Sequence, residues 1–166
     1  MLIRLAPPGE LETLSQIEMD AGVLFAEHGL GEVSRMGRSP ESLVPFQQAG
    51  DVWVADVDGR AAGYIMVEPV DGCLHVEQVS VDPGYARRGF GRALLEHVAD
   101  EARRRGYPAL TLTTFVELPW NAPFYAKCGY RILARDEETP GLRAIRTHEA
   151  ALGLDKWPRC CMRRDL

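Results

Sequence analysis

A strand that passes through a tight turn and a glycine-bearing loop into a helix constrains this fold more than any other stretch. It covers residues 74–97, LHVEQVSVDPGYARRGFGRALLEH. The first residues alternate as in a strand, and Asp82-Pro83-Gly84 ends it, because proline has no N–H for a ladder and glycine permits the turn. A helix then begins inside the loop, so the rest of the chain is organised around one strand–loop–helix unit.

The loop has the properties of an anion site. It consists of Arg87, Arg88, Gly89, Phe90, Gly91 and Arg92. The first N–H groups of a helix have no partner within the helix, and the helix dipole makes that end partly positive. The two glycines lack a Cβ, so a phosphate could approach the backbone, and the three arginines add charge. We interpret the loop as a diphosphate cradle; the alternative is an ordinary turn with solvated arginines.

Two known phosphate-binding motifs fit this loop poorly. A P-loop needs Lys-Ser or Lys-Thr after its second glycine, and neither Gly89 nor Gly91 is followed by such a pair. A dinucleotide fingerprint needs a third glycine, and Leu94 stands in its place. The loop resembles instead the acyl-CoA loop of the GNAT superfamily of N-acetyltransferases, [Q/R]-x-x-G-x-[G/A]. Ala86 replaces the first residue of that motif, which removes one side-chain contact but leaves the backbone amides that bind the diphosphate in the family.

Hydrophobic spacing and turn residues predict the element order β-α-α-β-β-β-α-β-α-β-α-β. The expected strands are residues 1–5, 52–58, 60–70, 74–81, 108–114, 130–134 and 159–164, and the expected helices are residues 10–27, 40–50, 90–105, 119–129 and 142–152. The strand–helix–strand crossover makes the fourth and fifth strands parallel neighbours. The length predicts one domain, residues 1–166.

This order resembles the GNAT fold over about residues 1–135 and the final strand, with an extra helix at 142–152. The resemblance implies an α/β fold (α+β in its mixed sheet), with helices on both faces and a splay between the fourth and fifth strands. The arm of acetyl-CoA, the expected co-substrate, would pair with the open backbone of Val79, Ser80 and Val81. The N–H of Val79 would stabilise the oxyanion of the tetrahedral intermediate, an effect of about 3 kcal/mol. The plainer interpretation, that Val79 and Val81 are simply core residues, is compatible with these roles, because the side chain and the backbone of a residue act separately.

A second stretch is similar to another family motif. Its matching residues are Ala122, Phe124, Tyr125, Gly129 and Tyr130. The resemblance places Tyr125 near the cofactor sulfur, where its hydroxyl could protonate the leaving thiolate; the alternative is a tyrosine packed in the core. Asn121 is interpreted either as a cofactor contact or as the N-cap of the helix.

The base that accepts the amine proton is expected on the fourth strand. His75 and Glu77 share a strand face with Val79. Family members carry an acid or a histidine at these positions and often relay the proton through water. Glu77 is the first candidate and His75 the second, and for each the alternative is a structural pairing with a neighbouring strand.

Composition restricts partners and location. The net charge of −5 argues mildly against nucleic acid, and no apolar run is long enough to span a membrane. The four cysteines show no metal spacing, so we expect no metal site and a reduced, cytoplasmic protein.

The resemblance to the GNAT superfamily implies an acetyl-CoA-dependent N-acetyltransferase in which a primary amine, on a small molecule or a peptide, attacks the thioester directly. The alternatives are a non-catalytic acyl-CoA-binding or regulatory domain and a nucleotide-binding module. The acceptor, the acyl-chain length and the oligomeric state, including a homodimer, stay open.

Overall fold

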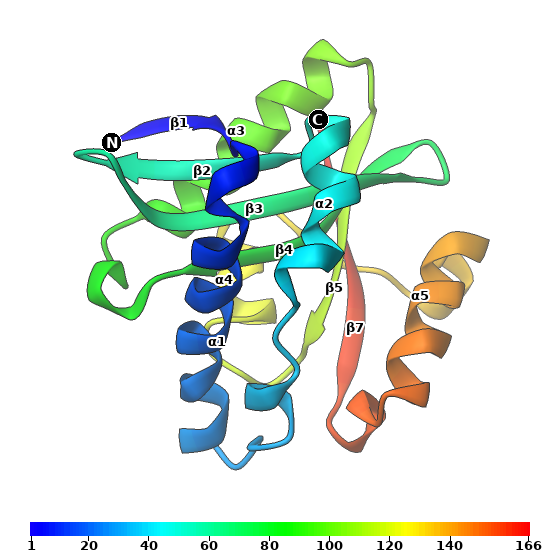
Figure 1. Cartoon of the computed structure of the whole chain (residues 1–166). Helices are drawn as coiled ribbons and strands as arrows, with labels where there is room; N and C mark the ends of the chain where they lie inside the picture. Colours follow the sequence, from blue (N-terminus) through cyan, green and yellow to red (C-terminus); the bar gives the residue numbers. More distant parts are fainter. The chain divides into compact units, whose positions relative to one another are not determined.

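Seven strands form one mixed sheet in the order β1-β2-β3-β4-β5-β7-β6, with β4 and β5 parallel. The computed structural model describes residues 1–166 (Figure 1). The strands are β1 (Leu2–Leu5), β2 (Val52–Val57), β3 (Arg60–Val70), β4 (Cys73–Val81), β5 (Ala109–Phe115), β6 (Arg131–Ile132) and β7 (Arg159–Asp165). The helices are α1 (Leu11–Glu27), α2 (Pro40–Ala49), α3 (Phe90–Arg104), α4 (Ala122–Lys127) and α5 (Pro140–Ala151). The predicted α/β class with a mixed sheet and helices on both faces is confirmed.

Contacts divide the chain into two compact units. The N-terminal unit comprises Met1–Val67 and Gln78–His97, and the C-terminal unit comprises Glu68–Glu77 and Val98–Leu166. The single domain expected from the length stays a prediction.

In the N-terminal unit, α1 and α2 lie side by side (Figure 1) and pack on β2 and β3. The buried residues of this core are Ala6, Leu11, Leu14, Ile17, Leu43, Val52, Val54, Tyr64 and Met66. Ser39 caps α2, since its hydroxyl accepts from the N–H of Ser42 at 3.4 Å. Gly63 lets β3 approach the end of β4 closely, because a Cβ there would stand 2.7 Å from the backbone oxygen of Ser80.

The pairing of β4 with β5 is short. It consists of Leu74 with Leu110 and His75 with Thr111, although β4 continues to Val81 and β5 to Phe115. By contrast, β5 pairs antiparallel with β7 along its whole length: Ala109 pairs with Asp165 at one end and Phe115 with Arg159 at the other. A short parallel ladder is what the predicted splay requires.

Two predicted elements are shorter than expected. Helix α4 begins at Ala122 rather than at residue 119, because the preceding residues form a turn in which Asn121 N–H donates to Leu118 O at 2.9 Å. Strand β6 keeps only Arg131–Ile132 of residues 130–134, because the chain turns into a 3₁₀ segment where the Glu137 carboxylate accepts from Ala134 N–H at 2.9 Å. Both segments belong to the C-terminal unit.

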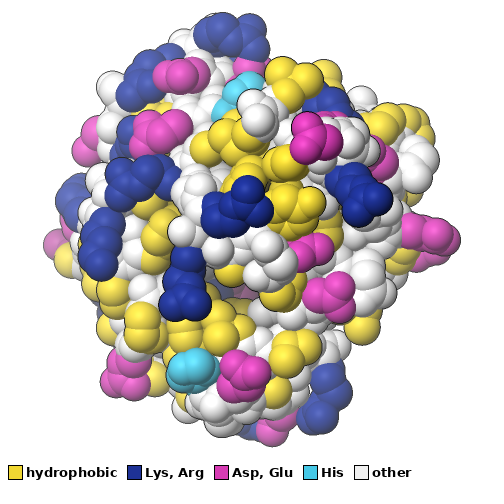
Figure 2. All heavy atoms as spheres, turned by 90° about the vertical axis from the view of Figure 1, so that its left-hand side faces the viewer, with side chains coloured by type: hydrophobic (Ala, Val, Ile, Leu, Met, Phe, Trp, Pro, Cys, Tyr) yellow, Lys and Arg dark blue, Asp and Glu magenta, His cyan; other side chains and the backbone are white.

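None of the helices combines the length and the apolar character needed to cross a bilayer. On the face shown in Figure 2, Lys and Arg side chains lie among acidic and apolar ones rather than in a block of one sign.

Candidate active site

The loop between β4 and α3 leaves three consecutive backbone donors without a protein acceptor. No protein oxygen accepts from the N–H groups of Gly89, Phe90 and Gly91, and the first backbone bond of the helix runs from Ala93 N–H to Gly89 O at 3.0 Å. Gly89 has a φ of +87°, a conformation that favours glycine, and nothing lies within 4 Å of the place a Cβ would take. Free donors at the N-terminus of a helix suit an anion, and the binding of a diphosphate at this loop, which we call the cradle, stays a prediction.

Side chains around the loop hold its shape. The Asp82 carboxylate accepts from Gly84 N–H at 2.7 Å and fixes the turn. The Arg88 guanidinium lies over the rings of Tyr85 and Phe90, 5.3 and 5.6 Å from their centroids, which orders it beside the cradle. Arg87 adopts a φ of +59°, which is uncommon for a residue with a Cβ.

The end of β4 presents Val79, Ser80 and Val81, the residues expected to meet the cofactor arm. Ser80 is buried and its hydroxyl accepts from the Gln78 amide at 2.9 Å, whereas Val79 and Val81 are half-buried. Their cofactor contacts stay a prediction.

Of the two candidate bases, Glu77 is the more accessible. The His75 side chain is 1% exposed and that of Glu77 is 20% exposed. His75 Nδ1 lies 2.9 Å from Thr111 Oγ1 on β5, and its Nε2 lies 3.8 Å from Glu77 Oε2. Burial lowers the pKa of His75 to about 4, against an opposing effect of the Glu149 carboxylate. His75 is therefore neutral at physiological pH, and its ring is far less accessible to a substrate than the Glu77 carboxylate.

This pKa predicts a pH dependence of stability. Between about pH 6.5, the ordinary pKa, and pH 4, the unfolded chain takes up a proton at His75 that the folded chain does not. The contribution of His75 to the free energy of unfolding is thus complete above pH 6.5. It is lost as the pH falls toward 4, by up to about 3 kcal/mol. We expect His75→Gln to flatten the free energy of unfolding over this range, measured in urea, while substitution of the exposed His148 leaves it unchanged. Equal slopes for wild type and His75→Gln would contradict the assignment.

Asn121 directly precedes α4, and Tyr125 lies within it. Asn121 is the N-cap residue by position, but its side chain does not cap the helix. Its Oδ1 instead accepts from Thr114 Oγ1 at 2.7 Å and from Phe115 N–H at 3.4 Å, which leaves its amide nitrogen without a protein partner. The cofactor contact of Asn121 stays a prediction, and that nitrogen is the atom that could make it.

The Tyr125 ring packs among aromatic side chains, 5.3 Å from Phe124 and 5.9 Å from Tyr130 between centroids. Burial raises the pKa of its hydroxyl, Cys128 raises it further and Arg159 opposes them. The hydroxyl stays protonated at neutral pH and can act as a proton donor.

One charged cluster of the C-terminal unit escaped the sequence analysis. Glu149 on α5 is 9% exposed and pairs with Arg146 at 2.8 Å and with Arg159 at 2.9 Å. Burial opposes its ionisation, but these arginines and Thr113 outweigh it and lower the pKa of Glu149. One feature of the sequence could have revealed the cluster: Glu149 lies at helical spacing from Leu142 and Ile145, which places its carboxylate on the apolar face of α5.

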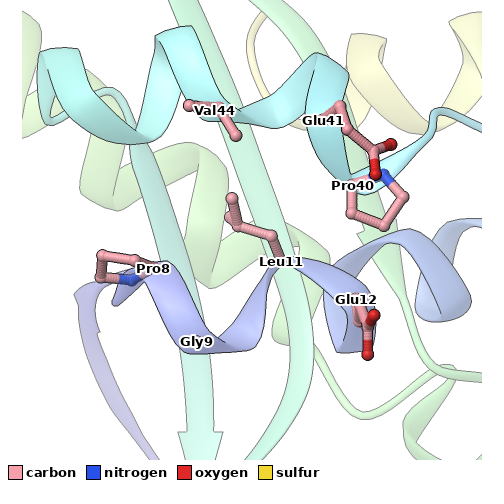
Figure 3. Close-up of a pocket in the computed structure, with 7 residues that line it drawn as sticks. All are labelled: Pro8, Gly9, Leu11, Glu12, Pro40, Glu41 and Val44. Carbon is pink, nitrogen blue, oxygen red and sulfur yellow. The ribbon is translucent and has the colours of Figure 1, made fainter.

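Two open pockets lie elsewhere within the units. Figure 3 shows one of about 310 Å³ between the starts of α1 and α2, where Leu11 and Val44 face each other and Glu12 and Glu41 lie at one end. The other, of about 380 Å³, is lined by Val116, Ala122, Pro123, Ala126, Tyr130, Arg131, Ile132 and Met162. Neither is lined by a candidate catalytic residue.

Known proteins share parts of this sequence. The chain is 40% identical over 55 residues to the [ribosomal protein bS18]-alanine N-acetyltransferase of Escherichia coli, a match that covers 33% of this chain and 37% of the relative. It is 29% identical over 96 residues to probable N-acetyltransferase 14 of Danio rerio, covering 57% of this chain and 33% of the relative. The chain thus spans about a third of the length of these relatives.

Solved structures share the whole fold. The PaiA N-acetyltransferase of Thermoplasma acidophilum, solved with coenzyme A, superposes with a TM-score of 0.73 at 19% identity, over 99% of this chain and 98% of that one. The ribosomal-protein-S18-alanine N-acetyltransferase of E. coli gives a TM-score of 0.70 at 20% identity, over 99% and 92%. The model of the acetyltransferase (GNAT) family matches residues 24–130, more than half of the sequence. The chain belongs to this family.

Proposed function

We propose that this protein is an acetyl-CoA-dependent N-acetyltransferase that moves an acetyl group to a primary amine by direct attack in a ternary complex. The observation that carries the proposal is the set of three unpartnered N–H groups at Gly89, Phe90 and Gly91, which open onto free space at the start of α3. Such donors suit the linked phosphates of coenzyme A, and Arg87 and Arg88 add positive charge at the same place.

The remaining roles are proposed residue by residue. In the N-terminal unit, Val79 N–H polarises the thioester carbonyl, and Ser80 and Val81 offer backbone groups to the cofactor arm. In the C-terminal unit, Tyr125 donates a proton to the departing thiolate and Asn121 contacts the cofactor through its amide nitrogen. Glu77, directly or through water, takes the proton of the attacking amine; His75 is the second choice because its ring is almost fully buried.

The acceptor is an amine of a small molecule or of a peptide. The name of the E. coli relative points to an alanine of a ribosomal protein, so we propose peptides with N-terminal alanine as the first acceptors to test.

A direct assay tests the activity. The protein is incubated with acetyl-CoA and a panel of amines and peptides, and release of the CoA thiol is measured. We expect turnover with at least one acceptor. Tight binding of CoA with no release from any acceptor would favour the non-catalytic acyl-CoA-binding domain instead.

Glu77→Gln tests the base. Removing the carboxylate is expected to lower kcat/KM about a hundredfold at pH 7, because general base catalysis contributes about 10²–10⁴. The deficit should shrink toward pH 9, where more of the acceptor amine is already deprotonated. Glu117→Gln, which changes an exposed glutamate of the same unit, is the control. A deficit that is the same at both pH values would contradict the role of Glu77.

A further inference from the structure

The half of β5 that lies beyond its ladder with β4 is held by side chains on both faces. The ladder with β4 ends at Thr111, and the next three residues before Phe115 have β7 as their paired strand. Side chains alternate along a strand, so Thr113 and Thr114 point to opposite faces.

On one face, Thr113 meets the charged cluster of α5. Its hydroxyl donates to Glu149 Oε1. Arg159 donates to both oxygens of the same carboxylate, from Nη2 to Oε1 at 2.9 Å and from Nε to Oε2 at 3.2 Å. Arg146 donates to Oε2 at 2.8 Å. The Arg159 guanidinium also lies 4.4 Å from the centroid of the Phe115 ring, so the cluster contacts β5 at Thr113 and at Phe115.

On the other face, Asn121 bonds the same part of β5. Its Oδ1 accepts from the Thr114 hydroxyl and from Phe115 N–H, and its backbone oxygen accepts from Tyr125 N–H at 2.9 Å. A continuous path of contacts therefore runs from Glu149 through Thr113, along the strand to Asn121 and on to Tyr125.

We propose that α5 is a brace for the active site: Glu149, through Thr113 and Asn121, positions Tyr125. The proposal rests on the proposed function, in which Tyr125 is the proton donor. Helix α5 lies outside the residues that the family model matches. Glu149 is 9% exposed and both of its carboxylate oxygens are occupied, so it acts as a positioning residue rather than a catalytic one. Arg159 supports the link, since it also lowers the pKa of Tyr125 against burial.

Thr113→Val and Glu149→Gln test the brace. Thr113→Val removes the hydroxyl and leaves the buried ion pairs intact, so it answers the question if Glu149→Gln folds poorly. Both variants are expected to lower kcat about tenfold and to change KM for acetyl-CoA less than twofold, because a displaced proton donor affects the chemical step. Asp155→Asn, which removes only the outer bond to Arg146 at 3.1 Å, is the control and should leave kcat unchanged.

A double-mutant cycle separates positioning from a general structural effect. In a Tyr125→Phe background, Thr113→Val should have no further effect on kcat, because the group that it positions is already absent. An undiminished tenfold loss in that background would overturn the proposal.

Hydrogen exchange gives a readout that needs no turnover. The N–H groups of Phe115 and Tyr125 both donate to Asn121, and we expect them to exchange faster in Thr113→Val than in wild type. If wild type shows no turnover with any acceptor, the proposed function fails, and the exchange rates still decide whether α5 braces this path. Unchanged exchange at both positions would overturn the brace.

Discussion

Replacing Tyr125 with phenylalanine is expected to lower kcat about a hundredfold and to leave the affinity for CoA unchanged. The departing thiolate needs a proton, and burial raises the pKa of the Tyr125 hydroxyl so that it remains a donor at neutral pH. Phenylalanine keeps the ring contacts with Phe124 and Tyr130 and removes only the hydroxyl. Thiol release measures kcat, and calorimetry with CoA measures the dissociation constant.

The matched control is Tyr107→Phe, which removes the hydroxyl of a half-buried tyrosine after α3. It should have wild-type kcat. If Tyr125→Phe also kept full turnover, the thiolate would leave without help from this residue, and the assignment of the proton donor would be wrong.

Gly89→Ala is expected to weaken CoA binding about tenfold or more. The new methyl group would stand in the open space over the cradle, where the phosphates are proposed to lie, and the φ of +87° disfavours any residue with a Cβ. The dissociation constants of CoA and of pantetheine, which lacks the diphosphate, are compared by calorimetry. The loss should be confined to CoA.

Gly50→Ala separates the two effects of this substitution. Gly50 follows α2 with a φ of +75°, and nothing lies within 4 Å of its Cβ position. Both variants should lose about 1 kcal/mol of stability from the strained backbone, but only Gly89→Ala should lose affinity. Equal losses of CoA affinity in both variants would show that backbone strain, not the cradle, accounts for the result.

Features set by neighbouring residues could be predicted from the sequence. The end of β4, the cradle and the start of α3 depend on Pro83, Gly89 and the unpaired donors of a helix terminus, all within a few residues. The hairpin at Asp58-Gly59 likewise follows from two residues that accept positive φ, here 52° and 80°. These elements depend on residues that are neighbours in the chain, so the local sequence pattern is sufficient to predict them.

Features that depend on distant partners could not be predicted. His75 was considered as a base, but Thr111, which bonds its ring, lies 36 positions away in the chain. Asn121 is interpreted as a cap or a cofactor contact; its side chain does not cap α4 and its Oδ1 binds β5, while the cofactor contact stays a prediction. Glu149 was not singled out, because its partner Thr113 is also 36 positions away and helical spacing alone does not reveal it. Sequence spacing identifies a buried face but not the residues that meet it.

The match to the family model has a practical consequence for how this protein can be divided. Residues 24–130 exclude β1 and β7, the antiparallel neighbours of β2 and β5. A fragment cut at those limits would expose backbone donors and acceptors along both strands, which invites aggregation through open sheet edges. The matched segment is therefore not a unit that can be transplanted, and chimaeras with other acetyltransferases need their junctions outside Leu2 and Asp165.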